Sequence, residues 1–172
     1  MAISLIVAAS DNDVIAKDGK VPWFVRGEQA IFKQVTMGHP IIMGRKTYET
    51  AKTYKSRPQL LPGRLNVIIT RQPDYKVPEG GVVAHSLDEA LAIPQVRAAD
   101  EVFIIGGGEI FDMAMPLADK LYYTRVHTTI ENGDKTFKFD PGQWRLVSSK
   151  LHRKHEVPDR PYDFEFQEWV RA

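Results

Sequence analysis

The chain has 172 residues, of which 43% are hydrophobic and 26% are charged, and its formal net charge at pH 7 is +1. These values are ordinary for one soluble globular domain, and they give no electrostatic case for binding nucleic acid or a membrane surface. The sequence has no cysteine, which excludes disulfides, thiolate metal sites and cysteine nucleophiles. The first apolar run, Leu5 to Ala9, is too short for a signal peptide or a membrane span, so we expect a cytoplasmic protein.

Apolar runs alternate with helix-like segments along the first two thirds of the chain. Continuous apolar runs favour strands that are covered on both faces, as in a parallel sheet. Such strands are predicted at 3–9, 40–43, 65–69, 81–84 and 101–105. Helices are predicted between them at 28–37, at 47 to about 54, at 86–93 with Ser86 as its N-cap, and at 109–115.

The C-terminal third is predicted to contain three strands, at 121–128, 144–151 and 162–170, with little helix between them. The last two strands are expected to form a hairpin, which would add an antiparallel edge to the sheet. The sequence therefore predicts an α/β fold in a single domain, residues 1–172. Its core would be a central, mostly parallel eight-stranded sheet with an antiparallel C-terminal strand, flanked by about four helices.

Three consecutive glycines, Gly106 to Gly108, stand where a predicted strand meets a predicted helix. Bare backbone at a helix start exposes N–H groups and the positive end of the helix dipole, which can receive a phosphate. The segment lacks the third glycine of the dinucleotide fingerprint, because Phe111 stands there, and it is not a P-loop. A tight turn that needs glycine for its backbone angles explains the segment equally well. These glycines alone leave both interpretations open.

Glu28 lies on the apolar face of the predicted helix 28–37. Positions i, i+3, i+4 and i+7 share a helix face, and the residues there are Ile31, Phe32 and Val35. The polar face is predicted to carry Gln29, Lys33 and Thr36. Burying an unpaired carboxylate costs free energy, so such a group usually has a partner or a task. The alternative is an acid in the first turn that interacts with the helix dipole.

Cations follow two predicted strands. Gly44, Arg45, Lys46 and Thr47 follow the strand 40–43, with Thr47 as a predicted N-cap, and Thr70-Arg71 ends the strand 65–69. If these strands are neighbours, Arg45 and Arg71 leave the sheet at one edge, where ligands of open α/β sheets bind. Together they could clamp a phosphate monoester, although each arginine alone fits a solvated surface charge.

Other candidate sites are weaker. Arg64 begins a strand after a turn and could bind a carboxylate through two parallel hydrogen bonds, or it could be surface charge. His152 and His155 have no nearby carboxylate that completes a metal signature, so no metal is predicted. The serines lack a Gly-x-Ser-x-Gly context, which disfavours a serine hydrolase.

The order of these motifs resembles dihydrofolate reductase over essentially the whole chain. The motifs are the apolar first strand, Pro22-Trp23, Glu28 with Phe32-Lys33, Met43 to Thr47, Leu61 to Asn66, Ile105 to Gly108, and Leu121 to Thr124. The resemblance implies NADPH-dependent reduction of 7,8-dihydrofolate to 5,6,7,8-tetrahydrofolate, by hydride transfer to C6 and protonation of N5, in support of one-carbon and thymidylate metabolism. It also implies that antifolate inhibitors bind. We expect a monomer that binds no nucleic acid and no membrane.

The resemblance implies a substrate site with three catalytic residues. Glu28 would bind the amino group and N3 of the pteridine, Thr124 would support it directly or through water, and Trp23 would hold a water nearby. Phe32 would stack on the substrate, and Arg64 would bind the α-carboxylate of its glutamate tail. Further substrate-site residues would be Ile6, Val7, Val21, Lys33, Leu61, Ile105 and Phe111.

The resemblance also implies a cofactor site for NADPH. The nicotinamide would be bordered by Ala8, Ile15 and Ala16, under a mobile loop of residues 9–23. The adenosine half, with its 2′-phosphate, would be held by Gly44, Arg45, Lys46, Thr47, Thr70 and Arg71. The pyrophosphate side would be formed by Gly106, Gly107, Gly108, Glu109 and Ile110. The family commonly has a cis bond between the first two of these glycines, so a cis peptide is predicted at Gly106-Gly107.

The chain departs from the family pattern at several points. Ala16 replaces a usual glycine of the loop, Glu28 stands where many bacterial members have Asp, and the segment 51–60 is longer than in compact bacterial members. The tripeptide Gly27-Glu28-Gln29 is similar to some plasmid-borne, trimethoprim-insensitive members. An antifolate-insensitive variant is therefore an alternative within the family.

Two other functions are alternatives to dihydrofolate reduction. A pyrimidine reductase of riboflavin synthesis resembles this fold and uses NADPH, but Glu28 with Phe32 and Arg64 favours a pteridine with a glutamate tail. A non-catalytic nucleotide-binding module is disfavoured by the combination of Glu28, Trp23 and Thr124.

Overall fold

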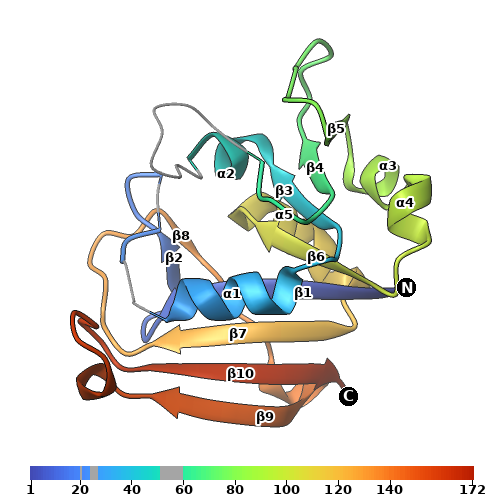
Figure 1. Cartoon of the computed structure of the whole chain (residues 1–172). Helices are drawn as coiled ribbons and strands as arrows, with labels where there is room; N and C mark the ends of the chain where they lie inside the picture. The colour runs from blue at the N-terminus through green and yellow to red at the C-terminus, as the bar shows by residue number, and fades with distance from the viewer. Residues whose placement is uncertain (20, 24–26, 51–59) are drawn as a thin grey trace. The chain divides into compact units, whose positions relative to one another are not determined.

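The computed structural model describes residues 1–19, 21–23, 27–50 and 60–172. Eight strands follow the hydrogen-bonded order β5-β4-β3-β6-β1-β7-β10-β9, and β2 with β8 forms a separate two-stranded sheet (Figure 1). The chain divides into two compact units, the first of residues 1–4 and 36–117 and the second of residues 5–35 and 118–172. Strand β1 (Ala2–Ser10) contributes residues to both units. Within the described residues, no helix is long and apolar enough to cross a membrane.

The first unit is a parallel sheet whose strands pair in the order β5-β4-β3-β6. Its central strands are apolar runs that are covered on both faces, since Ile41, Ile42, Val67 and Ile68 are all 0% exposed. The strands are β3 (Ile41–Gly44), β4 (Asn66–Ile69), β5 (Gly81–Ala84) and β6 (Glu101–Gly106). The helices are α2 (Arg45–Thr50), α3 (Leu87–Ala92), α4 (Pro94–Arg97), α5 (Gly108–Ala114) and the 3-10 turn η1 (Met115–Leu117).

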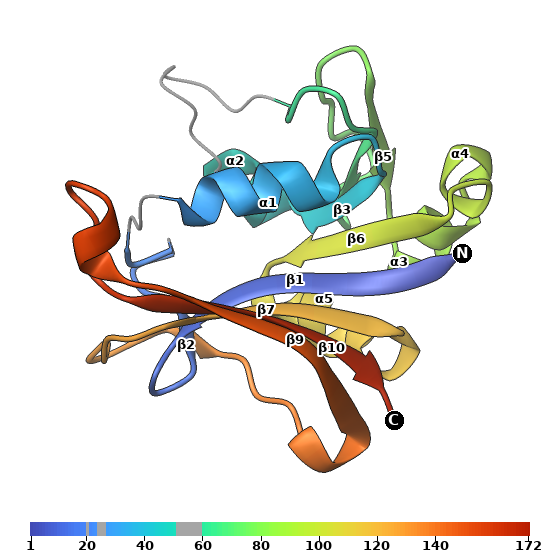
Figure 2. The same cartoon turned by 60° about the horizontal axis from the view of Figure 1, so that its bottom comes forward.

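The second unit is built on β7 (Lys120–Val126), β9 (Trp144–His152) and β10 (Phe164–Arg171). Strand β10 pairs antiparallel with both neighbours, and β9 and β10 run side by side in Figures 1 and 2. Helix α1 (Glu28–Thr36) also belongs to this unit, apart from its last residue. The remaining elements are β2 (Val14–Ala16), β8 (Lys135–Thr136) and the 3-10 turns η2 (Pro141–Gln143) and η3 (Lys154–Glu156).

The predicted α/β fold is confirmed, including the mostly parallel eight-stranded sheet and the antiparallel C-terminal strand. The segment 81–84 is a strand as predicted, and the last two strands form the predicted hairpin. The short strands β2 and β8 were not predicted, because three and two residues are too few to show a period.

The helices differ more from the prediction than the strands do. The described residues hold five α-helices rather than about four, because Pro94 ends the predicted helix 86–93 and begins α4. The predicted N-cap at Thr47 is wrong, since α2 already begins at Arg45. The end of that predicted helix and residues 51–59 of the longer segment 51–60 lie outside the described residues.

The predicted cap of α3 is confirmed with one change of partner. The Ser86 hydroxyl accepts a hydrogen bond of 3.0 Å from the backbone N–H of Glu89. The Glu89 carboxylate reaches back one residue further than in a capping box and accepts from the backbone N–H of His85 at 3.0 Å.

Candidate functional site

Glu28 is the first residue of α1 and is partly buried in the second unit. Burial raises the pKa of its carboxyl group from 4.5 to about 7, because desolvation penalises the charged form. An interaction with the helix dipole, the alternative interpretation from the sequence, would lower the pKa. With a pKa raised to about 7, the carboxyl group can exchange a proton near neutral pH.

The face of α1 that carries Glu28 packs onto the strand that carries Thr124. Ile31, one turn after Glu28, packs against a buried cluster of Val126 and Phe164. Thr124 precedes Val126 by two residues on β7, so their side chains lie on the same face of the sheet. This arrangement brings the acid and the threonine, predicted as catalytic partners, to facing surfaces within one unit.

Two further polar groups lie on or beside this surface. Trp23 packs on the same cluster, and its buried indole Nε1 has no hydrogen-bond partner within the described residues. Thr124 is 3% exposed, and among the described residues no hydrogen bond joins it directly to Glu28. A buried N–H group normally has a partner, which can be an ordered water. The indole N–H of Trp23 can therefore bind an ordered water.

Strand alternation separates the apolar residues predicted on β1. Ile6 and Ala8 point to one face of the strand, and Val7 points to the other. The side chains of Ile6 and Val7 therefore cannot line the same slot, and one of them can border a ligand only through its backbone. Val21 is 64% exposed. On α1, Phe32 is partly buried and Lys33 is exposed.

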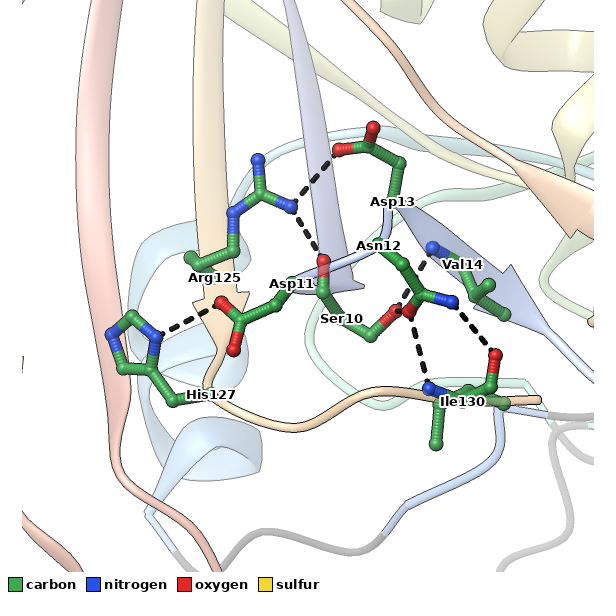
Figure 3. A network of polar contacts seen from close by, with 8 residues as sticks. All are labelled: Ser10, Asp11, Asn12, Asp13, Val14, Arg125, His127 and Ile130. Atoms are coloured by element: carbon green, nitrogen blue, oxygen red, sulfur yellow. Dashed lines mark hydrogen bonds and ion pairs between the residues drawn. The ribbon is translucent and has the colours of Figure 1, made fainter.

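The start of the predicted mobile loop is fastened to β7 and to the chain that follows it (Figure 3). One guanidinium nitrogen of Arg125 donates to the backbone carbonyl of Ser10 and, at 3.0 Å, to the carboxylate of Asp13. Asn12 donates to the carbonyl of Ile130 at 2.8 Å and accepts from its N–H at 3.1 Å. These contacts fix the position of the loop where it leaves β1.

A second set of contacts holds the middle of the same loop. The Asp134 carboxylate accepts from the N–H of Gly19 at 2.8 Å, and the Asp134 N–H donates to the carbonyl of Ala16 at 2.8 Å. The pairing of β2 with β8 adds backbone contacts around Ile15. Both residues predicted to border the nicotinamide from this loop are thus in fixed positions. Sequence reasoning missed Asp134 and Arg125, because their partners are more than 100 residues away along the chain.

The two predicted phosphate turns lie against each other in the first unit. A Cβ added to Gly107 would lie 3.3 Å from the hydroxyl of Thr47, and a Cβ added to Gly44 would lie 3.2 Å from the side chain of Ile110. The predicted cis peptide at Gly106-Gly107 is confirmed. The glycines therefore let two backbone segments approach closely at one edge of the sheet.

Arg45 and Arg71 follow neighbouring strands, as predicted. Gly44 of β3 pairs with Ile69 of β4 in parallel register, so both arginines leave the sheet at the same edge. Arg45 Nη1 lies 3.2 Å from Glu49 Oε1. Arg71 is exposed and forms no ion pair within the part of the chain that the structure describes. The edge thus offers positive charge close to the glycine turns.

The other residues predicted for the first unit are placed as follows. Thr70 is 6% exposed, and its carbonyl oxygen lies 2.9 Å from Nδ1 of His85. Lys46 and Glu109 are exposed. The residues that are buried or partly buried are Leu61, Ile105, Gly108, Ile110 and Phe111.

Arg64 is held in place by oxygen atoms without charge. Its Nε donates to the carbonyl of Pro62 at 3.0 Å, and its Nη1 donates to the hydroxyl of Thr36 at 3.0 Å. Burial lowers the pKa of its guanidinium group. Arg64 also lines an open pocket of about 310 Å³ with His39 and Gln95. The predicted placement of Thr36 on the polar face of α1 is wrong, because Thr36 is 0% exposed and orients this arginine.

Within the described ranges, no group of three or more His, Cys, Asp or Glu side chains could hold a metal ion.

Comparison with known proteins gives one consistent family. The sequence profile described as dihydrofolate reductase matches residues 2–171. The dihydrofolate reductase of Bacillus subtilis strain 168 is 42% identical over 165 residues, which are 95% of this chain and 91% of that protein. Dihydrofolate reductase type 3 of Salmonella typhimurium is 44% identical over 161 residues, with 93% of this chain and 91% of the relative covered.

A solved structure agrees with the sequence matches. Dihydrofolate reductase from Enterococcus faecalis, complexed with NADP(H) and RAB-propyl, superposes with a TM-score of 0.84 at 31% sequence identity. The similarity covers 99% of this chain and 96% of that protein.

Proposed function

The chain belongs to the dihydrofolate reductase family, and on that premise we propose which of its residues carry the reaction. The protein is an oxidoreductase that reduces 7,8-dihydrofolate to 5,6,7,8-tetrahydrofolate with NADPH as its cofactor. NADPH supplies a hydride to C6 of the pteridine, and N5 receives a proton. The family match spans nearly the whole chain, which disfavours both a pyrimidine reductase and a non-catalytic binding module.

The substrate half of the site is formed around Glu28. Its carboxyl group binds the amino group and N3 of the pteridine, and Thr124 supports it through water. The indole N–H of Trp23 holds a water nearby, which supplies the partner that this buried donor lacks within the described residues. The observation that carries this proposal is the partly buried carboxyl group of Glu28 on the face of α1 that packs onto β7.

Proton transfer follows from the pKa of Glu28. With a pKa of about 7, a sizeable fraction of the carboxyl groups is protonated at neutral pH. Glu28 therefore favours protonation of N5, with the water beside Trp23 as the immediate donor. Phe32 stacks on the pteridine and Arg64 binds the α-carboxylate of the glutamate tail. Antifolate inhibitors bind the same half-site.

The cofactor half of the site lies on the glycine turns of the first unit. Gly44 and Gly107 carry no Cβ, so the segments around them pack closely, and the cofactor lies against the backbone that they form. Arg45 and Arg71 bind the 2′-phosphate that distinguishes NADPH from NADH. In the second unit, Ala8, Ile15 and Ala16 border the nicotinamide, held there by the contacts of the loop with Asp134.

We further propose the assembly, the location and the inhibition of the protein. The protein acts as a monomer in the cytoplasm, without nucleic acid or membrane partners, and its two units work as a single domain. It is inhibited by antifolates. An antifolate-insensitive variant is the alternative, and inhibition measurements on purified protein separate the two.

Steady-state kinetics test this proposal. The wild-type protein is expected to oxidise NADPH when dihydrofolate is added, and not when a pyrimidine substrate of riboflavin synthesis is added. Arg64→Ala is expected to raise the KM for dihydrofolate but not that for a dihydropterin without a glutamate tail. An equal effect on both substrates would contradict the role of Arg64, and no turnover of dihydrofolate by the wild type would contradict the proposal as a whole.

A further inference from the structure

The guanidinium group of Arg45, at the edge of the sheet, is paired with a carboxylate. Its Nη1 lies 3.2 Å from Oε1 of Glu49, one turn further along α2. The hydroxyl of Tyr75 donates to the same oxygen at 2.9 Å. One carboxylate oxygen therefore accepts from both the arginine and the tyrosine, and it links α2 to the segment that follows β4.

The position of Tyr75 is itself restrained. Its ring meets the ring of Tyr48 edge to face, with centroids 6.4 Å apart, and Tyr48 is 5% exposed in the core. Burial and the hydrogen bond to Glu49 raise the pKa of Tyr75 to about 12, so its hydroxyl remains a donor throughout the neutral range. A buried ring thus anchors the tyrosine, the tyrosine anchors the carboxylate, and the carboxylate holds Arg45.

An exposed ion pair between residues i and i+4 contributes little on its own. The side chains of Arg45 and Glu49 are 33% and 37% exposed, so an isolated pair here would often separate. A third partner that fixes the carboxylate changes this, because the arginine then loses less conformational freedom when an anion binds. The Arg45 guanidinium has four further N–H groups that can donate to a ligand.

We propose that Glu49 and Tyr75 are positioning residues that hold Arg45 ready for the 2′-phosphate, and so set the preference for NADPH over NADH. This inference rests on the proposed role of Arg45 in cofactor binding. Glu49 would thus favour phosphate binding, although its own negative charge repels a phosphate. In this site, the gain in NADPH affinity from holding Arg45 in position is larger than the loss from that repulsion.

Equilibrium binding of NADPH and NADH tests the inference in four variants. Glu49→Ala is expected to weaken NADPH binding about fivefold, with the loss visible in the KM for NADPH rather than in that for dihydrofolate. Glu49→Gln keeps an acceptor oxygen for Arg45 and Tyr75, so it is expected to retain wild-type affinity within about twofold. Tyr75→Phe is expected to lie between them. NADH binding stays the same in all three, because NADH has no 2′-phosphate.

Arg45→Ala distinguishes a failure of this inference from a failure of the proposal that Arg45 binds the 2′-phosphate. If Arg45→Ala keeps the wild-type preference for NADPH, Arg45 does not bind the 2′-phosphate and both ideas are overturned. If Arg45→Ala loses the preference while Glu49→Ala keeps or gains NADPH affinity, only the positioning role is overturned. Equal losses in Glu49→Gln and Glu49→Ala, or equal losses for NADPH and NADH, would also overturn it. Thermal unfolding of each variant confirms that it is folded.

Discussion

Gly107 lies so close to Thr47 that an added Cβ would stand 3.3 Å from the threonine hydroxyl. Thr47 lies in α2, which follows β3, and Gly107 precedes α5, which follows β6, so both stand at the edge where parallel strands of the first unit end. The three consecutive glycines left a structural turn and a phosphate site equally open. Their contact with Thr47 shows that a side chain larger than glycine has little room there, and the part of these glycines in cofactor binding remains the proposal made above.

Substitution of the first two glycines is expected to give unequal losses of stability. Gly106 has φ +111°, which an L-residue rarely adopts, and a Cβ there would lie 3.0 Å from the ring of Phe111. Gly106→Ala is therefore expected to lower the free energy of unfolding by about 2 kcal/mol or more. Gly107→Ala, with an ordinary backbone and a contact that needs only a small shift, is expected to cost less. Urea denaturation measures both, and equal losses would contradict this reading.

The anchor of the loop gives a second prediction. Arg125→Gln removes charge-assisted hydrogen bonds to Ser10 and Asp13 and is expected to lower the free energy of unfolding by about 1–2 kcal/mol. Arg145→Gln, at an exposed position of β9, is the matched control and is expected to change it by less than about 0.5 kcal/mol. The difference between the two variants is measured by urea denaturation. Equal stability of both variants would show that the loop does not depend on this anchor.

The sequence predicted the strands well because fully buried strands leave continuous apolar runs. The segments 41–43 and 67–69 are such runs, and both are central strands of the first unit. The sequence predicted the two arginines at one sheet edge because parallel neighbours necessarily end together. Glu28 was found because its charge interrupts an apolar helix face.

The sequence could not show contacts between residues that lie far apart along the chain. Thr36 was predicted on the polar face of its helix, yet it is buried, and its hydroxyl accepts a hydrogen bond from Arg64. Arg125 and Asp134 look like ordinary surface charges, and only the fold brings them to the loop at the other end of the chain.

The raised pKa of Glu28 predicts how the stability of the ligand-free protein depends on pH. The carboxyl group titrates at 4.5 when unfolded and at about 7 when folded, so between these values the folded state binds more protons. The contribution of this carboxyl group to the free energy of unfolding is fully present below pH 4.5 and is lost as pH rises through about 7. Glu28→Gln, which stays neutral, is expected to be more stable than wild type above pH 7, by on the order of 1–3 kcal/mol. A stability difference that does not grow between pH 5 and pH 8 would contradict the burial of this carboxyl group.

Because strand β1 contributes to both units, we expect the two units to unfold together. The first residues of β1 belong to one compact unit and its remaining residues to the other, so neither unit keeps a complete set of strands when the other is lost. We expect a single cooperative transition in urea, with coincident curves from circular dichroism and tryptophan fluorescence. The tryptophans report on the second unit, because all three lie there. Two separated transitions would show that the units are independent domains.

The dependence of kcat/KM on pH, compared between wild type and Glu28→Gln, tests the central claim most directly. If Glu28 supplies the ionisation that governs protonation of N5, kcat/KM for dihydrofolate in the wild type falls as pH rises through about 7. In Glu28→Gln the activity is expected to be lower by at least about a hundredfold at neutral pH, and this ionisation disappears. A variant with unchanged activity, or with the same titration as the wild type, would contradict the role assigned to Glu28.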